Sequence, residues 1–237
     1  MKRFDGRAPD ELRPVTLQPG FLQRTPGSVI IGCGDTRVLC TAVLEEKVPP
    51  FLEGKNQGWM TAEYAMMPAS TPPRRHARET LRPDGRSTEI KRLIGRSLRA
   101  AVDLSALGER TIYLDCDVLE ADGGTRTASI TGAYVALALA QRAWLEAGVL
   151  KQPFLRRPVA AVSVGLVKGQ PLLDLCYRED SRADVDCNVV MAGDALVEVQ
   201  ASAEGSPFTR AQWDELLDLA IGGIQRLFAL QRQALDE

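Results

Sequence analysis

The sequence contains a single histidine, His76, and five cysteines that show no paired CxxC spacing. One histidine argues against a Ser-His-Asp triad and against a metal site built from histidines. The cysteines are odd in number and lie mostly on apolar runs, which favours reduced thiols over disulfides and points to a cytoplasmic protein. The formal net charge is only −2. We therefore do not expect the whole surface to bind polyanions, although local basic clusters can still bind nucleic acid.

From the sequence we expect neither a signal peptide nor a membrane-spanning stretch. Residues 1–7 have no apolar core. The Ala- and Leu-rich segment 129–147 is shorter than 20 residues and contains Gln141, Arg142 and Glu146, so it is expected to be a core helix. The length of 237 residues and an apolar fraction of 45% are ordinary for a globular protein. No linker is evident, and we predict one domain covering residues 1–237.

The most informative stretch is residues 117–132, which read as a strand, a glycine turn and the start of a helix. Gly123 and Gly124 allow the backbone to bend and to approach a ligand closely. Thr125 offers a hydroxyl and Arg126 a fixed cationic fork, next to the free N–H groups of a helix N-terminus. This combination suits an oxyanion such as phosphate. A glycine turn beside a surface arginine would also explain so short a motif on its own.

Hairpins and helices recur in two halves of the chain, which favours an α+β fold over a doubly wound sheet. Alternating apolar residues predict strands that pair as hairpins, and the 3.6-residue period predicts helices. The expected hairpins comprise residues 28–31 with 36–44, 159–167 with 172–177, and 185–191 with 195–201. The expected helices cover residues 88–104, 129–147 and 209 to about 235, the last beginning with a capping box of Thr209 and Gln212.

Four acidic residues lie between two predicted strands: Glu179, Asp180, Asp184 and Asp186. Carboxylates this close repel one another, so a divalent cation or an arginine is expected nearby. Their hard oxygen atoms suit Mg²⁺ or Mn²⁺. A solvated acidic loop is the alternative interpretation.

Two basic clusters are candidates for RNA contact. One is a helix face and the other is a proline-rich loop that also holds His76, itself interpreted as a surface residue. The helix face carries Arg92, Arg96 and Arg99, and the loop carries Arg74, Arg75, Arg78 and Arg82. The helix face alone could equally be a solvated surface.

Several longer motifs, in order, resemble the ribonuclease PH family. They comprise Arg86 with residues 89–100, then 115–133, 179–181, 185–191, 198–200, 203–205 and 207–208. The resemblance implies a phosphate-dependent 3′→5′ exoribonuclease that trims the 3′ ends of transfer RNA precursors and of other RNAs. It releases nucleoside diphosphates and adds nucleotides in reverse. The resemblance also implies an α+β fold of the ribosomal-protein-S5 domain-2-like type and a homohexameric ring, a trimer of dimers. The expected partner is RNA, not DNA or a membrane.

Carried over by position, the resemblance assigns roles to the candidate residues. Arg86, Gly124, Thr125 and Arg126 would hold the attacking phosphate. Asp180 and Asp186 would be the catalytic and metal-associated carboxylates, with Mg²⁺ or Mn²⁺ as the metal. The sequence departs from the family at Ala69, where an arginine is expected, in the Pro- and Arg-rich loop, and at Ala201-Ser202 in place of Gly-Thr.

Two other functions compete with phosphorolysis. A non-catalytic subunit of an exosome-like ring would lack the phosphate-binding arginines or the aspartates, and both are present. A metal-dependent hydrolase would use water and would need no separate arginine sites for free phosphate. Phosphorolysis needs both a basic site that aims phosphate and an acidic site that handles the leaving group.

Overall fold

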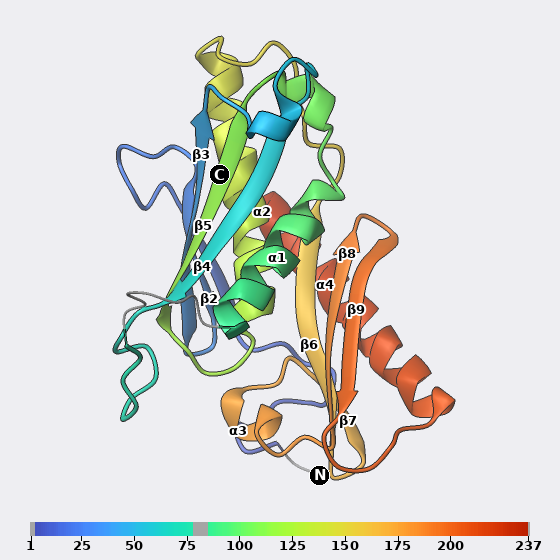
Figure 1. Cartoon of the computed structure of the whole chain (residues 1–237). Coiled ribbons are helices and arrows are strands. Elements are labelled where there is room, and N and C mark those ends of the chain that lie inside the picture. The colour runs from blue at the N-terminus through green and yellow to red at the C-terminus, as the bar shows by residue number, and fades with distance from the viewer. Residues whose placement is uncertain (1–2, 78–84, 237) are drawn as a thin grey trace.

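The computed structural model describes residues 3–77 and 85–236, so Arg78 and Arg82 lie outside the described residues. The described part is built in layers: a mixed sheet, two helices, an antiparallel sheet and a final helix (Figure 1). This arrangement confirms the predicted α+β class.

The first sheet has five strands in the order β1-β2-β3-β5-β4. Its strands are β1 (Val15–Pro19), β2 (Ser28–Cys33), β3 (Thr36–Glu45), β4 (Trp59–Met66) and β5 (Thr111–Glu120). The β2–β3 hairpin is confirmed, whereas β1 and β4 were not predicted. β4 runs parallel to β5. Parallel neighbours require a crossover, and α1 (Gly85–Arg99) lies in this one. A short 3₁₀ helix follows each of β3 and α1, at Pro50–Leu52 and Leu104–Leu107.

The second sheet has four antiparallel strands in the order β7-β6-β8-β9. Its strands are β6 (Val159–Val167), β7 (Gln170–Leu173), β8 (Val185–Ala192) and β9 (Ala195–Ala203). Both predicted hairpins are confirmed. The predicted strand 172–177 is misplaced, because β7 already begins at Gln170 and ends at Leu173. The chain then turns at Asp174, with φ of 53°, and enters the short helix α3 (Tyr177–Asp180). Every residue of β6 is buried, since helices cover both faces of this strand.

The long helix α2 (Thr125–Glu146) lies between the sheets and packs on β2, β3 and β6. Its small, apolar residues allow close approach on several sides, which confirms the predicted core helix. Gly132 shows how close the packing is, because an added Cβ would lie 2.7 Å from the Ile31 side chain. The last helix, α4 (Arg210–Asp236), covers the other face of the second sheet. The predicted capping box is confirmed, with Thr209 N donating to Gln212 Oε1 at 2.8 Å and Gln212 N donating to Thr209 Oγ1 at 3.3 Å.

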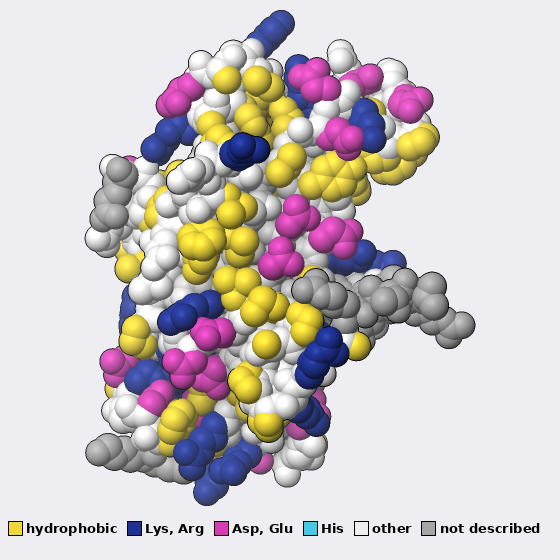
Figure 2. Space-filling model, turned by 90° about the vertical axis from the view of Figure 1, so that its left-hand side faces the viewer, with side chains coloured by type: hydrophobic (Ala, Val, Ile, Leu, Met, Phe, Trp, Pro, Cys, Tyr) yellow, Lys and Arg dark blue, Asp and Glu magenta, His cyan; other side chains and the backbone are white. Residues whose placement is uncertain are grey.

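The outer face of the first sheet carries the exposed side chains of Val43 and Tyr113. Figure 2 turns this side of the molecule towards the viewer and shows hydrophobic side chains in its middle with acidic side chains beside them. Asp115 belongs to this face, and burial together with the charges of Asp117 and Glu63 raises its pKa. All five cysteines are free thiols, as expected. Within residues 3–77 and 85–236, no helix has the length and apolar character needed to span a membrane.

Candidate active site

A cavity of about 650 Å³ brings the predicted phosphate site and the predicted acidic site together. Its walls come from the glycine turn before α2, the start of α1, the end of α3, one face of β8 and the loop after β4. These segments are far apart in sequence. The cavity therefore depends on the packing of both sheets around α2.

The glycine turn has the conformation that its sequence predicts. Gly123 and Gly124 have φ of 76° and 66°, in the left-handed region that favours glycine. A Cβ on Gly123 would lie only 2.7 Å from the backbone nitrogen of Tyr177. Glycine at this position thus lets α3, which ends in Asp180, pack directly against the turn.

The first turn of α2 offers an anion site. No side chain caps this helix at Gly124, so its first N–H groups stay available to a ligand. The Thr125 side chain is buried, and its Oγ1 lies 2.9 Å from the hydroxyl oxygen of Tyr64 on β4. This hydrogen bond fixes the Thr125 hydroxyl at the edge of the cavity, where Thr125 is one of the lining residues.

Two arginines supply positive charge to the same cavity. Arg126 follows Thr125, and its Nη1 lies 3.5 Å from Gln200 Oε1 and 3.8 Å from Glu89 Oε1. Arg86 stands on the first turn of α1, is exposed and lines the cavity. The contact with Glu89, also on α1, holds Arg126 beside the helix that carries Arg86.

Two of the four predicted acidic residues line the cavity. Burial and the charge of Asp180 raise the pKa of Asp186 to about 6, against the opposing effect of Arg126. Partial burial also raises the pKa of Asp180, while the charges of Arg126 and Arg86 lower it. The two carboxylates thus lie within electrostatic reach of each other and of both arginines. A carboxyl with a pKa near 6 can donate or accept a proton close to neutral pH.

The other two acidic residues are not brought into the cavity. Glu179 is buried and receives hydrogen bonds from Arg3 Nε at 2.8 Å and Arg3 Nη2 at 2.7 Å. Burial alone would raise the pKa of Glu179, but the hydrogen bonds and charge of Arg3 hold it below its usual range. Asp184 is absent from the cavity lining as far as the described residues show.

The donor set limits what kind of metal site is possible. Among the described residues, no three His, Cys, Asp or Glu side chains are grouped to hold a metal ion. Asp180 and Asp186 supply two hard oxygen donors at most. That number fits Mg²⁺, which takes one or two carboxylates and completes its shell with water and substrate phosphates. It does not fit a closed structural metal site.

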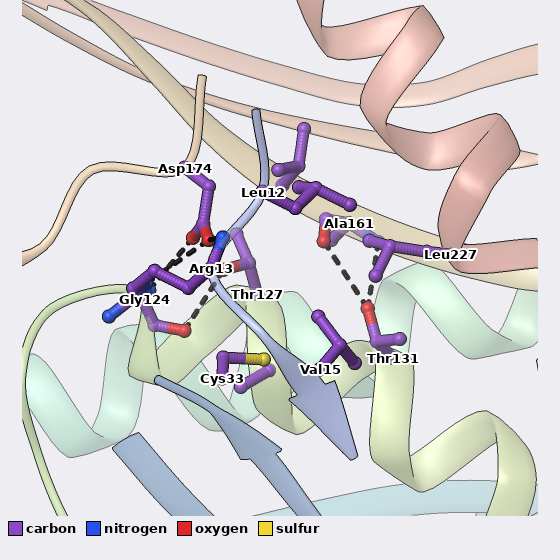
Figure 3. Close-up of a pocket in the computed structure, with 12 residues that line it drawn as sticks. Leu12, Arg13, Val15, Cys33, Gly124, Thr127, Thr131, Ala161, Asp174 and Leu227 are labelled. Carbon is purple, nitrogen blue, oxygen red and sulfur yellow. Dashed lines mark hydrogen bonds and ion pairs between the residues drawn. The ribbon is translucent and has the colours of Figure 1, made fainter. Parts of the chain in front are cut away.

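Sequence reasoning missed a buried ion pair that supports the glycine turn, shown in Figure 3. Arg13 Nη2 lies 2.8 Å from Asp174 Oδ1, and Arg13 Nη1 donates to the backbone carbonyl of Asp122 at 2.6 Å. Arg13 Nη2 also donates to the Gly123 carbonyl at 3.4 Å. Burial would lower the pKa of Arg13, but its hydrogen bonds to Asp174 raise it. No local sequence pattern indicates an ion pair between residues that are 161 positions apart.

The predicted RNA-binding arginines differ in their surroundings. Arg96 forms an ion pair with Glu198 on β9. Arg99 donates to the Met60 carbonyl at 2.9 Å and stacks over the Trp59 ring. The remaining described arginines of the two clusters, Arg74, Arg75 and Arg92, are exposed.

The proline-rich loop contributes directly to the cavity. Arg74 and His76 both line it, although His76 was expected to be a plain surface residue. Arg78, the third predicted RNA-binding residue of this loop, lies outside the described residues.

The sequence and the fold are similar to those of known proteins. The profile of the 3′ exoribonuclease family, domain 1, matches residues 11–143, and that of domain 2 matches residues 157–223. Ribonuclease PH of Crocosphaera subtropica is 56% identical over 237 residues, covering 100% of this chain and 98% of the relative. Ribonuclease PH of Moorella thermoacetica is 56% identical over 240 residues, covering 100% and 96%. The expectation of one domain over residues 1–237 stays a prediction.

Solved structures agree with this relationship. A structure of the Archaeoglobus fulgidus exosome with RNA bound to the active site has a TM-score of 0.82 at 26% identity, covering 96% of this chain and 92% of that one. Rice (Oryza sativa) Rrp46 has a TM-score of 0.79 at 18% identity, covering 98% and 100%, which shows the shared fold. The chain therefore belongs to the 3′ exoribonuclease family and is a phosphorolytic 3′→5′ exoribonuclease of the ribonuclease PH type, with inorganic phosphate as its co-substrate.

Proposed function

We propose that the cavity around Asp186 is where phosphate cleaves the last nucleotide from an RNA 3′ end. The observation that carries this proposal is the meeting of an anion site and a pair of carboxylates in one cavity. Neither half alone would support phosphorolysis. An anion site by itself only binds phosphate, and a carboxylate pair by itself has no means of aiming phosphate as a nucleophile.

In this proposal Arg86, Gly124, Thr125 and Arg126 hold the attacking orthophosphate. The backbone N–H groups and the Thr125 hydroxyl donate to its oxygens, and the two guanidinium groups neutralise its charge. An oxygen of the phosphate attacks the phosphorus of the terminal nucleotide. The bond from that phosphorus to the preceding 3′ oxygen breaks, so the product is a nucleoside diphosphate. The same arrangement run backwards adds a nucleotide.

Asp180 and Asp186 serve the departing 3′ oxygen in this proposal. With a pKa of about 6, Asp186 keeps its proton in about a tenth of molecules at pH 7. That fraction is enough for it to act as the acid that protonates the leaving oxygen. In its deprotonated form Asp186 would instead join Asp180 in holding Mg²⁺ or Mn²⁺, and the ion would supply charge neutralisation at the scissile phosphate.

The RNA that we propose as substrate is the 3′ end of a transfer RNA precursor, in the cytoplasm. We propose that the exposed arginines Arg74, Arg75 and Arg92 contact its backbone, together with Arg78, Arg96 and Arg99 of the same two basic clusters. We also propose a homohexameric ring, a trimer of dimers. A solved relative described as an archaeal exosome core, with a TM-score of 0.77 at 25% identity, supports a ring assembly.

A non-catalytic ring subunit is the alternative function, and the cavity disfavours it. Such a subunit has no need to preserve a phosphate turn, two arginines and two carboxylates in one place. Here the glycine turn, Arg86, Arg126, Asp180 and Asp186 all line the same cavity.

Substitution of the two arginines tests the site. Arg126→Ala and Arg86→Ala should each lower the rate of phosphorolysis on the order of a hundredfold, or about 3 kcal/mol, because a charged clamp on the reacting groups is lost. The measurement is the steady-state rate of nucleoside diphosphate release against phosphate concentration. Arg210→Ala is the control, since Arg210 is exposed and forms an ion pair with Asp214 on α4. Near-normal rates in both cavity variants would remove the assignment.

A further inference from the structure

Asn188 is a buried polar residue in the cavity that the proposed mechanism does not use. It is 7% exposed and lies two residues after Asp186 on β8. Successive side chains of a strand point to opposite faces, so these two residues share one face. The alternate residues Cys187 and Val189 pack in the core beneath α4. Asn188 therefore faces away from α4, and it lines the same cavity as Asp186.

The Asn188 amide has no hydrogen-bond partner among the described residues. Its neighbours across the sheet are Ser163 on β6 and Gln200 on β9. Ser163 Oγ accepts a hydrogen bond from Leu175 N at 3.1 Å. Gln200 Nε2 donates to Glu198 at 3.1 Å and to Glu89 at 3.4 Å. Both neighbours thus have partners elsewhere, and the amide is left directed into the cavity.

The amide is not one of the fully buried side-chain groups that lack a partner, so it is open to the cavity and can donate to a bound ligand. The cavity already contains acceptors at Asp180 and Asp186 and donors at the start of α2. A ligand that spans both halves carries phosphoryl oxygens between them. These oxygens are acceptors, and an amide NH₂ group can donate to them without adding charge.

We propose that the Asn188 side-chain NH₂ donates to a non-bridging oxygen of the reacting phosphoryl groups. This inference rests on the proposed function, because it takes the cavity as the place of phosphorolysis. It adds a substrate-binding residue to the arginines and aspartates. The two sources of such an oxygen are the attacking orthophosphate and the terminal phosphodiester of the RNA.

Asn188→Ala and Asn188→Asp are the test variants, assayed in the full-length protein with a short RNA oligonucleotide and inorganic phosphate. Loss of one preorganised donor should lower kcat/KM on the order of a hundredfold. Aspartate has the same shape but adds negative charge, so its activity should fall further than that of the alanine variant. A raised KM for phosphate would assign the bond to orthophosphate, and a lowered kcat at saturating phosphate would assign it to the RNA phosphodiester. Either result supports the proposal.

An oligonucleotide with a 2′-deoxy terminal nucleotide separates this role from recognition of the ribose. The proposal predicts the same loss for Asn188→Ala on both substrates. A loss confined to the ribose substrate would mean that the amide binds the 2′-hydroxyl, which overturns the proposal. Activity within about twofold of the unaltered protein would also overturn it, given a predicted change on the order of a hundredfold.

Two further variants make each failure distinguishable. Arg126→Ala is measured in the same assay. If Arg126→Ala is inactive and Asn188→Ala is normal, only the role of Asn188 fails. If both are normal, the proposed site itself fails. Asn188→Ser keeps a small polar donor, so it should be more active than Asn188→Ala. Its Tm should equal that of the unaltered protein. No recovery despite a normal melt would contradict a donor role.

Discussion

Replacing Asp186 by asparagine is expected to stabilise the protein at neutral pH while stopping the reaction. The pKa of Asp186 is about 6 in the folded protein, against an ordinary value of 3.8. The unfolded chain therefore releases this proton at lower pH than the folded chain does. Between about pH 4 and pH 6 the folded state binds more protons, so this group lowers the free energy of unfolding as pH rises. Above about pH 6 the ionised Asp186 carboxylate lowers the free energy of unfolding by its full amount.

The size of the penalty follows from the shift. About two pKa units at about 1.4 kcal/mol each give an upper value near 3 kcal/mol. Asp186 is partly accessible from the cavity, so we expect a gain of about 1 to 2 kcal/mol for Asp186→Asn at pH 7. Burial is the first cause of the raised pKa and repulsion by Asp180 the second. Asparagine removes the charge but keeps the shape, so both causes disappear together.

Urea denaturation at pH 7 and at pH 4, with a chelator present, measures the effect. Asp186→Asn should have a higher free energy of unfolding at pH 7, and the difference from the unaltered protein should shrink towards zero near pH 4. Asp184→Asn is the control, because Asp184 is two positions away and outside the described cavity lining. Equal stability of Asp186→Asn and the unaltered protein at pH 7 would refute the reasoning, as would a gain that persists unchanged at pH 4.

Two other predictions concern the support of the site and the grip on RNA. Arg13→Met or Asp174→Asn should each lower the free energy of unfolding by about 3 to 5 kcal/mol and raise the KM for phosphate. The double variant should lose less free energy of unfolding than the sum of the two single losses. Additive losses in urea denaturation would contradict a coupled pair. Changing Arg74, Arg75 and Arg78 together to alanine should weaken binding of transfer RNA precursors and flatten its salt dependence. Cleavage of a short oligonucleotide should fall less, although Arg74 lines the cavity. An unchanged salt slope would remove the loop from the RNA path.

Local features of the site could be predicted from the sequence because they depend on neighbouring residues. The glycine turn follows from the ability of Gly123 and Gly124 to adopt positive φ, and the long core helix follows from its composition. The capping box of α4 is equally local. The gathering of Arg86 with Asp186 is different, since nothing in spacing links them. Only the resemblance to a family suggested that they meet.

The features that the sequence did not reveal are long-range. β4 is a strand because β5 pairs with it in parallel, across a helix and a loop. Arg13 meets Asp174 only after both sheets have packed around α2. Arg96 looked like part of a free basic face, but Glu198 lies beside it in the fold. Such partners come from sheet order and layer packing, and no pattern within a short window contains them.

The central claim is that phosphate, and not water, cleaves the RNA, and the product tests it most directly. A 3′-labelled RNA oligonucleotide is incubated with the protein with and without inorganic phosphate, and the released nucleotide is identified. We predict nucleoside diphosphate in the presence of phosphate and almost no release in its absence. Release of nucleoside monophosphate at the same rate without phosphate would contradict the account.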